Sequence, residues 1–193
     1  IRSLCAKSLF LSKGRTIAFG KTNDIIEKYS NDFMGDDNYK LVFDEQPNKE
    51  MQLEEASIIF NKENQELDSD CQIKLKIKLK TRTIVHGAYV TFSILDPFDS
   101  VIYWTSDVKS DRFKNPKVGE TNLICDCPKS LLAPGRYSIH FAIISLGNKT
   151  VFHESDKRIF FELKEPHNSL LAGYGINTPG YIGITSTWSS KDE

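Results

Sequence analysis

Two groups of residues in this chain have the types and spacing that could support chemistry. Asp96 and Asp99 flank Pro-Phe, so two carboxylates come together as they do in calcium sites. Asp is also common in tight turns, where its side chain bonds to the backbone, and we expect that role here. Cys125 and Cys127 share one face of an extended segment. No Cys/His pair lies at zinc spacing, so we expect buried thiols and no metal site.

Enzyme signatures are missing from the sequence. It contains no G-x-x-x-x-G-K-S/T phosphate loop, no G-x-S-x-G turn, no H-E-x-x-H motif and no calcium-binding loop. Glycoside hydrolysis would need two carboxylates that face each other across a cleft. Asp96, Asp99, Asp107 and Asp126 lie near expected strand ends, but nothing in the sequence pairs them. We therefore expect a binding module without a cofactor, not an enzyme.

Alternation of apolar and polar residues dominates the chain after residue 51. In Cys71–Lys80 every second residue is apolar, and all but one of the residues between them are lysines. One face of the strand is therefore expected to be buried and the other to face solvent. The expected strands are Leu53–Phe60, Cys71–Lys80, Ala88–Asp96, Val101–Ser106, Thr121–Cys127, Arg136–Ser145, Lys149–Glu154, Arg158–Leu163 and Tyr181–Trp188. No apolar stripe of helical period follows residue 51, so the sheets should be antiparallel. The sequence predicts an all-β sandwich of the immunoglobulin-like or jelly-roll kind.

Composition limits the partners and the cellular location that we expect for the protein. A formal net charge of −1 gives no general attraction to nucleic acid, so none is expected as a partner. No apolar run is long enough to span a bilayer, and no signal peptide is evident at the start. The four cysteines do not have the spacing of a secreted disulfide scaffold. We therefore expect a cytoplasmic protein.

The first 29 residues follow a different pattern. Leu9–Leu11, Gly14-Arg15, Gly20, Ile25-Ile26 and Tyr29 indicate a strand, a tight turn, a second strand and an amphipathic helix, after a short helix end at residues 1–5. In order and spacing this segment resembles the end of an ABC-transporter ATP-binding domain. Polar residues follow, with a short extended piece at Tyr39–Phe43. We expect an ATPase-domain remnant at 1–30, a linker at 31–50 and the β-sandwich at 51–193.

The whole chain resembles the C-terminal part of the nucleotide-binding subunit of a polysaccharide ABC exporter, an O-antigen export ATPase with a fused carbohydrate-binding domain. The resemblance rests on the front segment and on four later motifs. These are Val90-x-Phe92-x-Ile94-x-Asp96, Gly119 before Thr121–Cys127, Pro134-Gly135-x-Tyr137, and a final strand with Gly183 and Trp188. Members of this family vary in the sugar that they recognise, so the ligand does not transfer with the resemblance.

The resemblance implies recognition before transport. The sandwich would bind the non-reducing end of a lipid-linked polysaccharide in the cytoplasm and present it to the transmembrane subunit. ATP and Mg²⁺ would belong to an upstream domain. Relatives are dimeric with strand exchange, and the final strand Tyr181–Trp188 is the candidate here, with Pro166–Pro179 as its hinge.

Sugars are bound by aromatic faces and by polar groups that hydrogen-bond hydroxyls, so the outward positions of the strands are candidates. Alternation places three residues outward in Ala88–Asp96 and two polar residues outward in Arg136–Ser145. In Val101–Ser106 two adjacent residues are aromatic, so one of them must point away from the core. The candidate carbohydrate-binding residues are Tyr89, Thr91, Ser93, Tyr103, Trp104, Ser138 and His140.

Each candidate has a structural alternative. Trp104 could fill an edge of the sandwich, His140 could be a solvated histidine, and Trp188 could close the sandwich or a dimer contact. The lysine stripe Lys74, Lys76, Lys78 and Lys80 could attract an anionic sugar, but exposed strand lysines also suppress edge pairing, and we expect that role.

A rival function is a β-sandwich that dimerises the ATPase or docks a biosynthetic enzyme without binding sugar. Such a module would carry an outward hydrophobic stripe. Outward positions of the expected sandwich are mostly Lys, Thr, Ser and His. Apolar residues of the first segment would be exposed without its parent sheet, so that segment should be poorly ordered or pack on a neighbouring chain. These residues are Leu9, Phe10, Leu11, Ile17 and Phe19.

Overall fold

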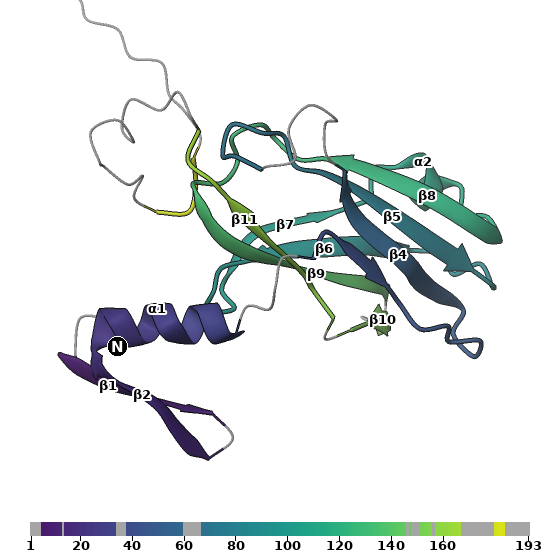
Figure 1. Cartoon of the computed structure of the whole chain (residues 1–193). Coiled ribbons are helices and arrows are strands. Elements are labelled where there is room, and N and C mark those ends of the chain that lie inside the picture. Colours follow the sequence, from purple (N-terminus) through teal and green to yellow (C-terminus); the bar gives the residue numbers. More distant parts are fainter. Residues whose placement is uncertain are drawn as a thin grey trace, which may run out of the picture.

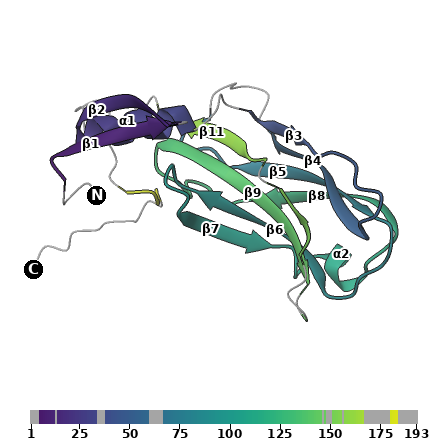
Figure 2. The same ribbon diagram turned by 90° about the horizontal axis from the view of Figure 1, so that it is seen from below.

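Two packed sheets and a separate N-terminal hairpin with a helix make up the chain (Figure 1). The computed structural model describes residues 5–12, 14–33, 38–59, 67–145, 147, 151–155, 157–166 and 180–183. The hairpin and helix lie at one end of the sandwich, and the short helix α2 (Asp111–Lys114) lies at the other (Figure 2).

The N-terminal unit has the predicted order of strand, turn, strand and helix. Antiparallel strands β1 (Lys7–Ser12) and β2 (Arg15–Lys21) are joined by a turn in which Gly14 has a φ of 74°, a conformation that glycine adopts without strain. Helix α1 (Thr22–Phe33) follows, and the Thr22 hydroxyl donates to the Cys5 carbonyl at 2.6 Å. The buried Phe10 ring meets Tyr29 edge-on at 5.3 Å, so the hairpin packs one face on the helix.

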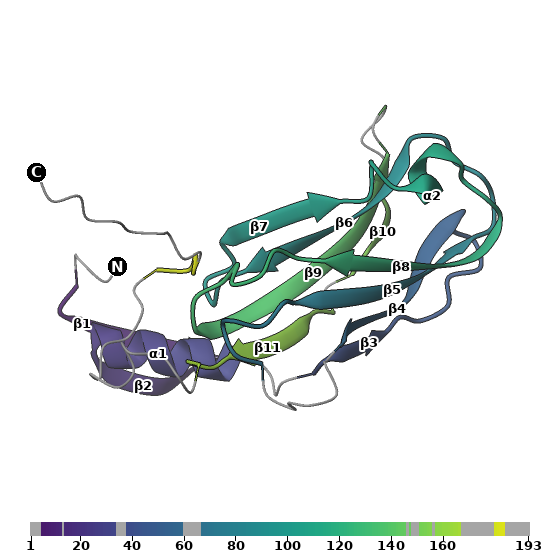
Figure 3. The same ribbon diagram turned by 90° about the horizontal axis from the view of Figure 1, so that it is seen from above.

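Every pairing between the named strands of the sandwich is antiparallel, which confirms the predicted fold class, and the described residues add an isolated parallel bridge between Asp68 and Lys164. One sheet has the order β3 (Lys40–Val42), β4 (Met51–Ile59), β5 (Lys74–Thr81), β8 (Gly119–Asp126). The other has the order β10 (Val151–Glu154), β9 (Gly135–Ser145), β6 (Ala88–Leu95), β7 (Val101–Ser106), and β11 (Ile159–Leu163) also pairs with β9. Figure 3 shows the two sheets from above. Strand β7 is an edge strand of one sheet and β8 is an edge strand of the other.

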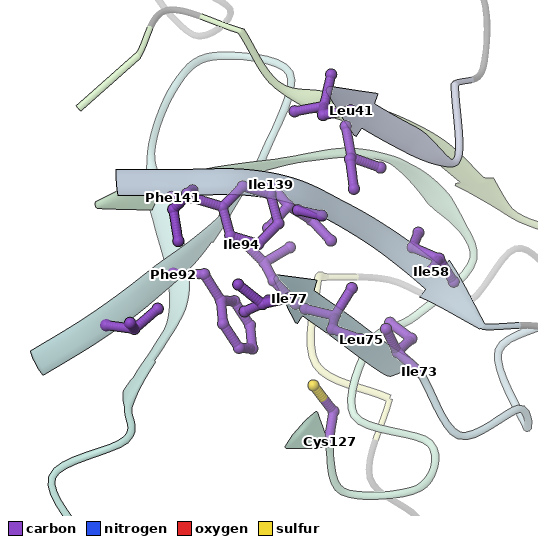
Figure 4. Close-up of a cluster of buried hydrophobic side chains, with 14 of the residues drawn as sticks. Leu41, Ile58, Ile73, Leu75, Ile77, Phe92, Ile94, Cys127, Ile139 and Phe141 are labelled. Atoms are coloured by element: carbon purple, nitrogen blue, oxygen red, sulfur yellow. The ribbon is translucent and has the colours of Figure 1, made fainter. Parts of the chain in front are cut away.

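The core lies between the two sheets and contains the residues that alternation places inward. Ile77 of β5 lies near Ile94 of β6 and Ile139 of β9 in a continuous apolar cluster (Figure 4). Phe92 packs against Phe141 with ring centroids 6.1 Å apart. Burial of such branched and aromatic side chains stabilises the fold by roughly 2 kcal/mol each.

Three lysines of the stripe on β5, Lys74, Lys78 and Lys80, form ion pairs with nearby acidic residues. Lys78 contacts Glu54 at 3.0 Å and Glu120 at 2.9 Å, and these hydrogen bonds raise the pKa of the lysine. Lys80 likewise meets Glu45 at 2.9 Å. The lysines face solvent as predicted, but β5 lies between β4 and β8, so the expectation that they suppress pairing at a sheet edge is wrong. The acidic residues beside them compete with an anionic ligand.

The expected linker at 31–50 contains more structure than its sequence indicates. Helix α1 continues to Phe33, and β3 pairs with β4 so that Leu41 lies opposite Ala56. Leu41 and the following Phe43 are buried in the sandwich core. Two alternating apolar residues are too short a pattern to identify an edge strand, which is why only an extended piece was predicted here.

The end of the chain is described only over residues 180–183. Ile182 forms a bridge with Leu132, and the Gly183 amide donates to the Leu131 carbonyl at 3.2 Å. A Cβ at Gly183 would lie 2.8 Å from the Leu132 carbonyl oxygen, so only glycine allows this approach. The remainder of the expected strand, with Trp188, and most of the expected hinge lie outside the described residues.

Candidate functional site

An aromatic, a hydroxyl and an imidazole stand side by side on the outer face of the second sheet. Ser93 of β6 pairs with Trp104 of β7 on one side and with His140 of β9 on the other. Directly paired residues of antiparallel strands point to the same face, with Cβ atoms about 5 Å apart. The three side chains therefore form a continuous line across three strands, which we call the outer row.

Trp104 is the exposed aromatic of the pair that the sequence left open. It is 54% exposed, whereas Tyr103 lies opposite Ile94 and places its ring 6.2 Å from Phe92 in the core. Burial raises the pKa of Tyr103. Tyr103 is therefore not on the candidate face, and the aromatic surface open to a ligand is Trp104.

Thr91 and Ser138 point outward as predicted but are closed to solvent. Thr91 is 4% exposed and donates its hydroxyl hydrogen to the Thr105 carbonyl at 2.7 Å. Ser138 is 1% exposed and lies between Leu95 and Phe160, its partners on the two neighbouring strands. Alternation gives the face on which a side chain lies, but not the neighbouring side chains that cover it. These two residues therefore form the floor of the candidate face, a buried layer that a ligand does not contact.

An ion pair links the two sides of this floor. Arg158, just before β11, pairs with Asp99 in the turn between β6 and β7. These two elements lie on opposite sides of β9 in the sheet order. The pair ties the turn to the far edge of the sheet and occupies the guanidinium of Arg158.

Tyr89 lies at the margin of the candidate face. It is half-buried and pairs with Ile144 of β9, two positions along from the buried Thr91. The small buried Ala142 separates it from His140 on the same face. Tyr89 therefore borders the outer row without belonging to it.

Glu154 extends the outer row and was missed from the sequence. It pairs with Ala142, and its Oε1 lies 3.9 Å from Nε2 of His140. The Glu154 side chain is 60% exposed and that of His140 is 23% exposed. The pairing register shifts between Val151 and His153, so Phe152 and His153 are both buried and simple alternation fails on β10.

His153 turns away from the outer row into the protein. It is 2% exposed, its ring meets Phe43 edge-on at 5.0 Å, and neither ring nitrogen has a hydrogen-bond partner among the described residues. Burial, together with the positive charges of Lys49 and His140, lowers its pKa to about 4. The imidazole is therefore neutral at pH 7 and acts as a packed core group.

The other chemical candidates have structural roles. Asp96 Oδ1 accepts hydrogen bonds from the Phe98 and Ser100 amides, both at 2.8 Å, so its turn role is confirmed. Cys127 is buried, and its side-chain hydrogen bond with Cys125, together with burial, raises its pKa. Among the described residues, no group of three His, Cys, Asp or Glu is arranged to hold a metal ion.

An apolar cleft of about 990 Å³ lies between the N-terminal unit and the nearby end of the sandwich. Its walls include Leu9, Phe10, Ile25, Ile26, Tyr29, Phe98 and Tyr181. It does not include any residue of the outer row. In the part of the chain that the structure describes, neither helix is long and apolar enough to cross a membrane.

These features define an antiparallel β-sandwich with an exposed aromatic and polar row on one sheet, preceded by a hairpin and a helix. No protein-family model matches the sequence, and no curated protein matches it. Among solved structures, the chain is similar to the crystal structure of the C-terminal domain of Wzt, with a TM-score of 0.59. The match covers 82% of this chain and 92% of that domain at 11% sequence identity. The two share their fold, which is the sandwich that the family resemblance implied.

Proposed function

We propose that the sandwich binds carbohydrate at the outer row: the non-reducing end of a lipid-linked, O-antigen-type polysaccharide, selected in the cytoplasm for export by an ABC transporter. The observation that carries this proposal is the exposed Trp104 in line with Ser93 and His140. The fold shared with the C-terminal domain of Wzt supports it. So does the N-terminal segment, whose sequence resembles the end of an ABC ATPase domain.

The outer row supplies the two kinds of contact that a sugar needs. The indole face of Trp104 can stack on the C–H-rich face of a pyranose ring. Ser93 and His140, at the next two positions across the sheet, can hydrogen-bond the hydroxyls at the rim of that ring. A flat, exposed row of this kind suits the end of a polymer, because the rest of the chain can leave the sheet without passing through a closed pocket.

In this function the chain only binds the polymer, and other domains and subunits of the exporter carry out the chemistry of export. ATP and Mg²⁺ would be bound by an upstream ATPase domain, and the transmembrane subunit of the exporter would receive the polymer. A homodimer, formed by exchange of the final strand, would present two outer rows to the transporter. Light scattering tests the dimer, and a monomer at all concentrations would contradict it.

Binding of the isolated chain to the delipidated polysaccharide of its source organism tests the proposal. We expect selective binding over an unrelated polymer by calorimetry or NMR, and a loss of affinity of about tenfold or more in Trp104→Ala and His140→Ala. Ile124→Ala and His86→Ala remove an exposed apolar residue and an exposed histidine elsewhere, and should bind normally. Equal binding by all four variants would exclude the outer row as the site.

A dimerisation or docking module without sugar binding is the second candidate. It is favoured by the exposed apolar side chains of the N-terminal hairpin, among them Leu11 and Phe19. A folded, dimeric protein that binds neither polysaccharide would support this function over carbohydrate recognition.

A further inference from the structure

We propose that Glu154 and His140 together form a clamp for one sugar hydroxyl, which makes the outer row selective for neutral sugar units over units that carry a carboxylate or phosphate. This inference rests on the proposed carbohydrate site and names the class of sugar that it takes.

The geometry of the pair leaves both groups available to a ligand. Glu154 Oε1 and His140 Nε2 are 3.9 Å apart, which is too long for a direct hydrogen bond. Both side chains reach solvent on the same face, and the buried Ala142 beside them on β9 adds no bulk that would block access. An oxygen atom placed between them can lie about 2.8 Å from each atom, within normal hydrogen-bond distance.

A hydroxyl is the group that fits this position chemically. It donates its hydrogen to the Glu154 carboxylate, which only accepts, and it accepts from the N–H of His140 in the tautomer protonated at Nε2. An ionised carboxylate or phosphate cannot donate to Glu154 and is repelled by its negative charge. The pair therefore distinguishes ligands by their ability to donate as well as by charge.

The surrounding charges reinforce this selectivity. Arg158, on the same sheet, is paired with Asp99. Lys74, Lys78 and Lys80 project from the other sheet and are paired with acidic residues. Within the outer row as extended by Glu154, the described side chains contribute one carboxylate and neither a lysine nor an arginine. The field at the row therefore disfavours an anion.

The test uses one polymer in two forms, binding to the full chain. The forms are the delipidated polysaccharide of the source organism, and the same material after oxidation of its primary hydroxyls to carboxylates. We expect the native chain to bind the unoxidised form about tenfold more tightly, a difference of about 1.4 kcal/mol, because the Glu154 carboxylate repels the carboxylates of the oxidised form. In Glu154→Gln that preference should fall to within about twofold, since the amide carries no charge.

Glu162→Gln is the matched control, because Glu162 is an exposed carboxylate on β11 of the same sheet and pairs in register with Arg136 rather than with the outer row. It should keep the tenfold preference. Equal binding of both polymer forms by the native chain, or an unchanged preference in Glu154→Gln, would overturn the clamp. If Trp104→Ala abolishes binding in that case, the carbohydrate site stands without it. Absence of binding to either form by the native chain would overturn both proposals.

Discussion

At the scale of single residues, the least usual group is the buried imidazole of His153. A hydrophobic environment with an aromatic ring at its edge favours the neutral form, and both ring nitrogens lack partners among the described residues. Its pKa falls from the usual 6.5 to about 4 on folding. Because the unfolded chain accepts this proton more readily than the native protein, folding and protonation oppose each other.

This opposition predicts acid sensitivity. Between about pH 6.5 and pH 4 the unfolded state binds more protons at His153, so stability should fall as the pH falls through that window. The contribution of His153 lost between pH 7 and pH 4.5 should be about 2 kcal/mol. Urea unfolding at both pH values should show this loss in the native chain and a smaller one in His153→Leu. His86→Ala, at an exposed position, should behave as the native chain does; an equal loss in His153→Leu would contradict the prediction.

The outer row shows how far single residues could be read from the sequence. The alternation on β6 and β9 correctly placed Ser93 and His140 outward, because period-two geometry fixes the face. It could not choose between Tyr103 and Trp104, since both are aromatic and adjacent, and only the pairing of Ser93 with Trp104 decides it. Nor could it show that Thr91 and Ser138 are covered, because cover comes from side chains on neighbouring strands.

At the scale of elements, a buried ion pair holds α2 and its preceding loop to the start of β6. Arg112 donates to Asp107 from Nε at 2.5 Å and from Nη2 at 2.9 Å, and Nη2 also donates to the Ala88 carbonyl at 2.8 Å. Asp107 in turn accepts from the Val90 amide at 2.8 Å. Both charged side chains are largely buried, so each depends on the other for its hydrogen bonds.

Breaking this pair should cost more than losing a surface ion pair. We expect Arg112→Ala to lower the free energy of unfolding by about 3 kcal/mol, because it leaves the Asp107 carboxylate buried and unpaired. Lys78→Ala removes an ammonium that pairs with Glu54 and Glu120 at the surface, and it should cost much less, because solvent screens such pairs. A double-mutant cycle with Asp107→Ala should show coupling of about 1–3 kcal/mol by urea unfolding. Additive effects would mean that the two side chains act independently.

The elements that the sequence predicted well are those with long alternating patterns. The run of β5 alternates apolar residues with lysines up to Lys80, so the face that it buries follows from periodicity alone, whereas its neighbours β4 and β8 do not. Strand β3 was only an extended piece in the sequence because it is three residues long. Strand β10 was predicted, but its outward residues were not, since the register shift between Val151 and His153 breaks the alternation on which such a reading depends.

At the scale of the whole molecule, the sandwich buries its apolar residues and the N-terminal hairpin leaves one face bare. Leu9 pairs with Phe19 on the face opposite the buried Phe10. Leu9, Leu11, Ile17 and Phe19 are between 42% and 66% exposed. Four large apolar side chains on one two-stranded ribbon form the kind of surface that marks an interaction site.

This bare face predicts that the chain associates through its hairpin. Sedimentation velocity should show association that increases with concentration, and Leu9→Ser with Phe19→Ser should weaken that concentration dependence, because burial of the two side chains would contribute roughly 2 kcal/mol each. The double variant should keep the thermal unfolding midpoint of the sandwich, since neither residue belongs to its core.

Ile124→Ser on β8 removes an equally exposed apolar side chain from the sandwich and should leave association unchanged. If the native chain is monomeric at every concentration, the face does not drive self-association; if both variants weaken association equally, general surface hydrophobicity, not the hairpin, is its cause.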